Sequence, residues 1–150
     1  MEKQLLYAYM AGIVDGEGSI SVKSESKSRP YIIYLNVTNC NYDMIYLFEK
    51  EFGGKVRSRK PKNKNWKLCY EWILSKKQAA TTLKLLLPYI RIKRRQALLV
   101  LRLASIKTWY NGGYLRWNRD KWIKVERIYS KIKTKCKKLN RRGVLQCTLE

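Results

Sequence analysis

Histidine is entirely absent from the 150 residues of this chain. Without it there is no imidazole general base and no imidazole metal ligand, so a catalytic centre would have to use carboxylates, amines or amides. The chain has four cysteines, Cys40, Cys69, Cys136 and Cys147, and none of them forms a C-x-x-C pair. A structural zinc site is therefore not expected. We expect the four to be reduced thiols of an intracellular, non-secreted protein.

Long apolar runs are missing too. No stretch is apolar enough to span a membrane and no signal peptide is apparent, so no membrane partner is expected. No internal repeat occurs, so any two-fold symmetry must come from a second copy of the chain. The composition is 45% hydrophobic and 12% aromatic, which predicts a folded domain rather than a disordered basic tail. We expect one domain over residues 1–150.

Acidic residues are scarce: 11 Asp and Glu stand against 33 Lys and Arg, giving a net charge of +22. A folded domain with this charge needs a polyanionic partner, and duplex nucleic acid is the commonest one. A solvated, ribosome-like basic protein is the plainer alternative. Residues 1–22, however, hold three acids and only one base. Metal binding is one explanation for an acidic opening on a basic chain.

Apolar periodicity predicts an α+β domain in the order α-β-β-α-β-β-α-α-α, with four antiparallel strands. Helices are expected over residues 5–14, 41–52, 75–87, 93–109 and 120–143, and strands over 19–25, 31–38, 55–59 and 66–74. Asn41 is the expected N-cap of the second helix, and Ser75 with Gln78 forms a predicted capping box. The fourth strand should turn Trp66, Leu68, Tyr70 and Trp72 inward. In the last helix the expected apolar stripe is Trp122, Val125, Ile128, Ile132, Cys136 and Leu139.

One face of the predicted sheet is polar, and helices should cover the other. The outward residues are expected to be Ser21, Lys23, Glu25, Ile32, Tyr34, Asn36, Lys55, Arg57, Arg59, Lys67, Glu71 and Ile73. A twisted sheet can lie in a major groove, where Arg contacts guanine and Asn contacts adenine. An ordinary solvated sheet face is the alternative. A surface that binds by charge alone, however, would not need acidic and amide side chains among its basic ones. We therefore predict a DNA-binding surface.

The first helix combines small residues with acids. Ala8, Gly12 and Gly16 recur at a spacing of four, which lets two helix backbones approach closely, either within the domain or between two chains. The helix then ends in Asp15-Gly16-Glu17-Gly18. Helix C-termini present unpaired carbonyl groups and partial negative charge, so two carboxylates there suit a hard cation. Taken alone, the same four residues would equally suit an acidic turn.

The segment Met10-Ala-Gly-Ile-Val-Asp-Gly-Glu-Gly18 resembles the LAGLIDADG motif of homing endonucleases, matching or conservatively replacing every position. The Ser-Ile-Ser-Val strand after it also fits. Later, Leu87-Pro-Tyr-Ile-Arg-Ile-Lys-Arg-Arg-Gln96 resembles the family segment that carries an active-site lysine. The resemblance covers about residues 5 to 104. It implies the LAGLIDADG homing-endonuclease fold, α-β-β-α-β-β-α with a four-stranded antiparallel DNA-binding sheet.

The resemblance also implies residue roles. Glu17 would bind divalent metal, Mg²⁺ or Mn²⁺, assisted by the backbone carbonyl of Gly16. Asp15 would be structural, and Lys93 would organise water near the scissile phosphate. Asn39 stands where the family more often has Gln and is a further candidate catalytic residue. Two chains would pair through the helix faces carrying Ala8, Gly12 and Gly16.

The leading interpretation is a homodimeric, site-specific endonuclease that cuts both strands of a long, near-palindromic DNA target and promotes intron mobility. No small-molecule substrate is expected. An RNA-splicing maturase that binds group I intron RNA on the same fold is the alternative, and a catalytically silent regulator of transcription is a third reading. The expected location is an organelle, chloroplast or mitochondrion, or a bacterial cytoplasm.

Overall fold

The computed structural model describes residues 2–26, 29–60, 65, 67–105 and 119–140. Its elements are α1 (Glu2–Glu17), β1 (Gly18–Ser26), β2 (Arg29–Asn39), α2 (Tyr42–Phe52), β3 (Lys55–Arg59), β4 (Cys69–Ser75), α3 (Lys76–Leu86), α4 (Arg94–Ala104) and α5 (Arg119–Leu139). The predicted element order and the α+β class are therefore confirmed.

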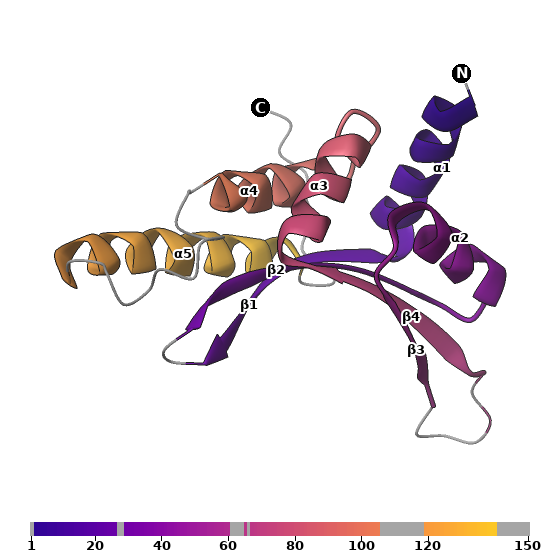
Figure 1. Cartoon of the computed structure of the whole chain (residues 1–150), viewed down its shortest axis with the longest axis horizontal. Coiled ribbons are helices and arrows are strands. Elements are labelled where there is room, and N and C mark those ends of the chain that lie inside the picture. Colours follow the sequence, from indigo (N-terminus) through magenta and orange to yellow (C-terminus); the bar gives the residue numbers. More distant parts are fainter. Residues whose placement is uncertain (1, 27–28, 61–64, 66, 106–118, 141–150) are drawn as a thin grey trace.

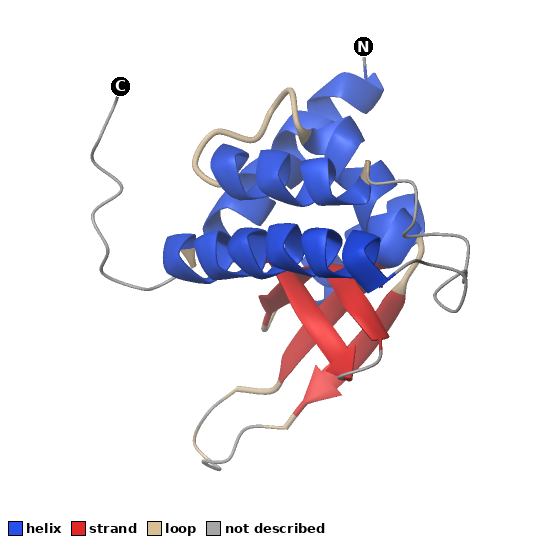
Figure 2. Ribbon diagram, turned by 90° about the vertical axis from the view of Figure 1, so that its left-hand side faces the viewer, coloured by secondary structure: helices blue, strands red, loops and turns tan. Residues whose placement is uncertain are grey.

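The four strands form one antiparallel sheet in the order β1-β2-β4-β3. The five described helices lie on one side of this sheet, and none of them covers the opposite, arched side (Figure 1). The view turned by 90° shows the same two layers, helices above and strands below (Figure 2). The arched side is called the open face from here on.

Alternation along the strands, interrupted by burial of both Ile32 and Ile33, produces the two faces. On β2, Ile33, Leu35 and Val37 are fully buried, and on β1 Ile20 is fully buried beside them. These side chains pack against Met10 and Val14 of α1 and against α2 and α3 in one core cluster. Each fully buried aliphatic side chain contributes roughly 1.5–3 kcal/mol. The core therefore fixes which residues are left for the open face.

The caps predicted for α2 are present. Asn41 accepts a hydrogen bond at its side-chain oxygen from the Met44 N–H, 3.2 Å away, and Gly53 ends the helix with a φ of 65°. Gly54 follows with a φ of 104°, and a Cβ there would lie 2.6 Å from Leu74. The buried Trp72 indole donates to the Gly53 carbonyl at 2.7 Å. Glycine is therefore required where the chain turns from α2 into β3.

Two predictions around β4 are wrong. The strand begins at Cys69 rather than 66, because its neighbour β3 ends at Arg59, which pairs with Cys69. Leu68, expected inward, is 41% exposed, and Trp66 lies outside the described residues. The capping box also fails: Ser75 is the N-cap of α3 but its side chain makes no cap hydrogen bond. Ser75 is still paired with Tyr34 in the sheet, which holds it extended.

The predicted apolar stripe of α5 is confirmed at Ile132 and Cys136, which are buried, and is wrong at Ile128. Ile128 is 44% exposed, whereas Tyr129 is 1% exposed and packs with Ile132 and Cys136. This stripe faces α4 and β1, the two elements that α5 contacts most. The side chains of Trp122 and Val125 lie outside the described residues, and so do residues 106–109 of the helix predicted over 93–109.

The expectation of four reduced thiols is wrong for one pair. Cys40 and Cys69 form a disulfide, with their Cα atoms 4.0 Å apart. The cause is register: Asn39 pairs with Tyr70 across β2 and β4, so the next residue along β2 lies opposite Cys69. Cys136 is a free, buried thiol, and burial raises its pKa to about 11. Cys147 lies outside the described residues. None of the helices described is both long and apolar enough to cross a membrane.

Candidate active site and nucleic-acid interface

Glu17 is the last residue of α1 and its side chain is exposed. The helix passes straight into β1, and at this junction a Cβ on Gly18 would lie 2.6 Å from the Val14 carbonyl oxygen. Only glycine fits such a close approach. Because Gly18 pairs with Val37, the end of β2 that carries Asn39 lies at the same end of the sheet as Glu17.

Asp15 holds the end of α1 against the segment before α4. Its carboxylate accepts hydrogen bonds from the backbone N–H groups of Arg91, Ile92 and Lys93, at 2.7, 3.1 and 2.9 Å. The side chain is buried, at 9% exposure. A carboxylate at a helix N-terminus satisfies donors that have no partner within the helix. Asp15 therefore occupies the structural role that the motif resemblance implied.

Lys93 reaches back to α1 from the other side of the same contact. Its ammonium donates to the Val14 carbonyl at 3.0 Å and to the Asp15 carbonyl. Burial lowers the pKa of Lys93, and the negative charges of Asp15 and Glu17 oppose that shift. The structure thus brings together Asp15, Glu17 and Lys93 from segments far apart in sequence. Nothing in the sequence signals the contribution of the Val14 carbonyl.

The carboxylate and carbonyl oxygens at the end of α1 suit a hard divalent cation. Glu17 offers an exposed carboxylate, and Lys93 already occupies the Val14 and Asp15 carbonyls. The carbonyl of Gly16 remains beside Glu17, and carboxylate and carbonyl oxygens are the ligands that Mg²⁺ prefers. Within the described part of the chain, no three His, Cys, Asp or Glu residues cluster as a metal site. One chain therefore offers an incomplete ligand set.

Asn39 is used locally. Its side-chain oxygen accepts a hydrogen bond from the Asn41 backbone N–H at 2.8 Å, which shapes the turn from β2 into α2. Its Nδ2 group remains for another partner. The register places it near Glu17, but its observed contact is with the turn.

The exposed side of α1 carries two of the three predicted interface residues, Gly12 and Gly16. Gly12 and Gly16 are exposed, and a Cβ at either position would meet nothing within 4 Å. Close packing inside the domain therefore does not explain them. Leu5 and Tyr9, which the sequence analysis missed, are 68% and 57% exposed on the same helix. Leu5 and Tyr9 stand at helical spacing from Gly12 and Gly16, and this spacing would have predicted that the four share one face of α1. Ala8 lies half-buried beside this face.

The open face holds most of the predicted DNA-binding residues. Lys23, Lys55, Arg57, Arg59 and Lys67 are exposed, and Ser21, Tyr34, Asn36, Glu71 and Ile73 are half-buried. Lys67 precedes β4, and the side chain of Glu25 lies outside the description. Thr38, which the sequence analysis missed, lies opposite Glu71 in the register. Extending the alternation of β2 by one more step would have found it.

The prediction for Ile32 is wrong, because its side chain is 4% exposed. It lies directly across from Lys23, whose ammonium stands 5.0 Å over the ring of Tyr34. Directly paired side chains on antiparallel strands lie about 4.5–5.5 Å apart at Cβ. The aliphatic part of Lys23 therefore runs beside Ile32 on its way to the tyrosine. Ile32 supports that contact rather than facing a ligand.

Glu71 is the acidic centre of the open face. It accepts a hydrogen bond at Oε1 from Asn36 Nδ2, 3.0 Å away, and its Oε2 lies 3.6 Å from Arg59 Nε. Arg57 stands directly across from it on β3. Basic and amide side chains from three strands therefore meet around the Glu71 carboxylate.

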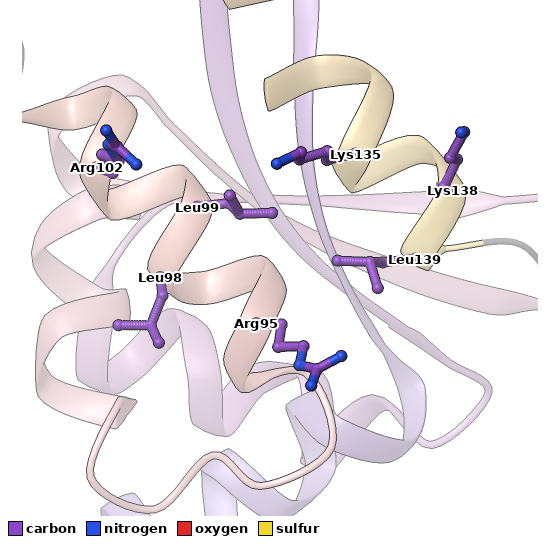
Figure 3. A pocket seen from close by; sticks show the side chains of 7 residues that line it. All are labelled: Arg95, Leu98, Leu99, Arg102, Lys135, Lys138 and Leu139. Carbon is purple, nitrogen blue, oxygen red and sulfur yellow. The ribbon is translucent and has the colours of Figure 1, made fainter. Parts of the chain in front are cut away.

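A second basic surface lies on the helical side, between α4 and α5. This groove, of about 570 Å³, is lined by Arg95, Leu98, Leu99, Arg102, Lys135, Lys138 and Leu139 (Figure 3). Four cationic side chains and three leucines line the groove, and none of the described residues that line it is acidic. No sequence motif marks this surface, because its two sides come from helices that lie far apart in the sequence.

No protein family and no curated protein matches the sequence. Among solved structures, the chain is similar to the homing endonuclease I-CvuI in complex with its target, with a TM-score of 0.71 and 26% identity over 99% of this chain and 89% of that one. It is also similar to the archaeal intron-encoded homing endonuclease I-Vdi141I complexed with DNA, with a TM-score of 0.71 and 18% identity over 94% and 87% of the two chains.

A third similar structure is the LAGLIDADG homing endonuclease I-SmaMI bound to cleaved DNA, with a TM-score of 0.58 and 15% identity. There the match covers 83% of this chain but 42% of I-SmaMI. This chain therefore corresponds to most of an I-CvuI chain and to less than half of an I-SmaMI chain. The resemblance of the segment from Met10 to Gly18 is confirmed: the chain has the fold of the LAGLIDADG homing endonucleases, and its match to I-CvuI and I-Vdi141I extends over most of its length.

Proposed function

We propose that this chain is one subunit of a homodimeric, divalent-metal-dependent endonuclease that cuts both strands of a long, near-palindromic DNA target. One observation carries the proposal. The exposed Glu17 ends a helix on which a Cβ added at the exposed Gly12 or Gly16 would meet nothing within 4 Å. The end of α1 is thus half of a metal site, next to half of a helix interface.

A second copy would complete both halves. Small residues let two α1 helices approach closely at Gly12 and Gly16, and the exposed Leu5 and Tyr9 would be buried further along the same contact. Paired helices would bring two Glu17 carboxylates to the two-fold axis. This arrangement accounts for an acidic helix end on a strongly basic chain.

Bound Mg²⁺ or Mn²⁺ would supply activation of water and stabilisation of the leaving oxygen. The chain's own residues would hold and order that site. Glu17 and the Gly16 carbonyl would hold the cation, and Asp15 fixes the position of the helix end. Lys93 is anchored on two α1 carbonyls, which places a positive charge beside the site where a phosphate would be cut.

The open face would bind the duplex on either side of that site. The solved neighbours I-CvuI and I-Vdi141I are homing endonucleases in complex with DNA, which supports the same partner here. Two chains related by a two-fold axis would meet two half-sites, so the target would be near-palindromic. Intron mobility, and a host organelle or bacterial cytoplasm, are the setting that we propose for this activity.

The metal assignment is tested by Glu17→Gln, which keeps the size of the side chain and removes its charge. We expect cleavage of a selected DNA target with Mg²⁺ to fall at least 10²-fold, because the cation loses its carboxylate ligand. DNA binding in Ca²⁺ should change little, because the open face is intact. Glu2→Gln, at the exposed start of the same helix, is the matched control and should cut normally. Normal cutting by Glu17→Gln would contradict the assignment.

An RNA-splicing maturase is the second candidate, and the groove between α4 and α5 favours it. Its four cations lie on the helical side of the sheet, away from the open face (Figure 3). Phosphates of a folded RNA would suit such a groove, and the DNA face would remain free.

Reversing the charge of Lys135 and Lys138 together to Glu tests the maturase candidate. RNA binding should weaken at least tenfold while DNA cleavage is kept, as measured by filter binding to group I intron RNA. The same reversal at Lys77 and Lys84, exposed on α3, is the control. Equal RNA binding by both double variants would contradict this candidate.

A further inference from the structure

Asn36 and Glu71 are joined across two strands of the open face by a hydrogen bond whose direction is chemically fixed. Asn36 Nδ2 lies 3.0 Å from Glu71 Oε1. An ionised carboxylate can only accept hydrogen bonds, whereas an amide has a donating end and an accepting end. The donating end of Asn36 must therefore face Glu71. Its accepting end, Oδ1, is left for other partners.

The neighbours of Glu71 on the open face hold its side chain in place. Arg59 Nε lies 3.6 Å from its second oxygen, and Arg57 is its direct neighbour across β3 and β4. The Glu71 side chain is 15% exposed, whereas that of Arg59 is 62% exposed. Glu71 thus accepts a hydrogen bond from Asn36 at one oxygen and forms an ion pair with Arg59 through the other.

We propose that Glu71 determines base specificity by fixing which end of the Asn36 amide the open face presents to DNA. With Oδ1 presented, Asn36 is a hydrogen-bond acceptor, so it selects an amino base, adenine or cytosine, over a keto base, guanine or thymine, at one position of each half-site. This inference rests on the proposed function, because it requires DNA on the open face. Glu71 acts here as a positioning residue for Asn36.

The major groove supplies the matching chemistry. Adenine presents its N6 amino group and cytosine its N4 amino group, and both are donors. Thymine O4 and guanine O6 are acceptors, so a keto base would set two acceptors against each other. A good side-chain contact to a base edge discriminates by about tenfold. An unrestrained asparagine has no such preference, since it can turn either end of its amide toward the base.

The Glu71→Gln variant should reverse the base preference of Asn36. Arg59 can only donate, so the glutamine would turn its Oε1 toward Arg59 and its Nε2 toward Asn36. Asn36 would then reverse its amide to accept from Nε2, and its own NH₂ group would face the DNA. We expect the selected base to change from amino to keto at that position, by about tenfold in relative enrichment.

A compensating pair provides the rescue. In Asn36→Asp combined with Glu71→Gln, the aspartate accepts from Gln Nε2 and can present only an acceptor to the DNA. The amino-base preference should therefore return. A merely structural role for Glu71 would not produce this alternation of base preference. Glu49→Gln, on α2 at the covered side of the sheet, is the control for the loss of one negative charge.

The experiment is selection from a pool of randomised DNA duplexes, followed by sequencing, with each variant in Ca²⁺. Asn36→Ala identifies the position, as the one whose base preference disappears. Selection of no sequence by the unaltered protein would contradict the proposed function itself. With a selected site in hand, a keto base there in the unaltered protein would overturn the inference. An amino preference that persists in Glu71→Gln would overturn it as well, and the expected alternation would support it.

Discussion

Asp15 is the residue on which the geometry of the candidate site depends, although it does not face a ligand. Its two oxygens accept three backbone N–H groups from residues 91–93, which hold Lys93 against the end of α1. Lys93 in turn donates to two α1 carbonyls. One set of hydrogen bonds is accepted by a side chain of α1, and the other is donated to the backbone of α1 by a side chain of the segment before α4. A carboxylate and an ammonium therefore fasten the motif helix to the start of α4.

Replacing Asp15 by asparagine tests this role. The variant keeps the shape of the side chain, but its NH₂ group would face N–H donors and leave at least one of them unpaired. We expect the free energy of unfolding to fall by about 3 kcal/mol, since hydrogen bonds to a charged group are lost and a buried donor is left unsatisfied. Urea unfolding followed by tryptophan fluorescence measures it. Asp43→Asn, an exposed acid in the first turn of α2, is the control, and equal midpoints for the two variants would contradict the role.

At the scale of elements, local signals predicted what is locally determined. The helix over 42–52 carries its own cap at Asn41 and its own stop at Gly53, and β3 coincides with the predicted 55–59. The start of β4 was mispredicted because it depends on where its partner strand ends. Ser75 makes no capping hydrogen bond, and Lys76, the first residue of α3, has a φ of 54°, outside the helical region. Such facts depend on partners that a sequence pattern does not name.

The candidate site also contains some features that the local sequence predicts and others that depend on contacts between distant segments. The motif from Met10 to Gly18 predicted Glu17 at the end of a helix, because the motif is contiguous in sequence. The partners of Asp15 at 91–93 and the link between Asn36 and Glu71 join distant segments, and no spacing rule predicts them. The disulfide between Cys40 and Cys69 likewise follows from the register of β2 and β4. Tertiary packing, not propensity, decided each of these contacts.

At the scale of the whole molecule, the two layers carry different surfaces. The open face presents bases around one acid, and the helical side presents the groove of four cations between α4 and α5. A third surface, on the exposed side of α1, carries the small and apolar residues Leu5, Tyr9, Gly12 and Gly16. In the proposed dimer the two chains would meet at this surface, because the strongly basic surfaces of two copies would repel each other.

Gly12→Val separates the fold of one chain from its pairing with another. Nothing lies within 4 Å of a Cβ at position 12, so the monomer should keep its structure and its melting temperature within a few degrees. Two α1 helices, however, could no longer approach closely, because the added methyl groups of each chain would meet the partner backbone. We expect the variant to sediment as a monomer at concentrations where the unaltered protein is a dimer, and to lose double-strand cleavage. Gly12→Ala, which adds one small group, should weaken pairing less. A dimeric Gly12→Val variant that still cuts both strands would show that the metal-binding ends of α1 meet by some other face.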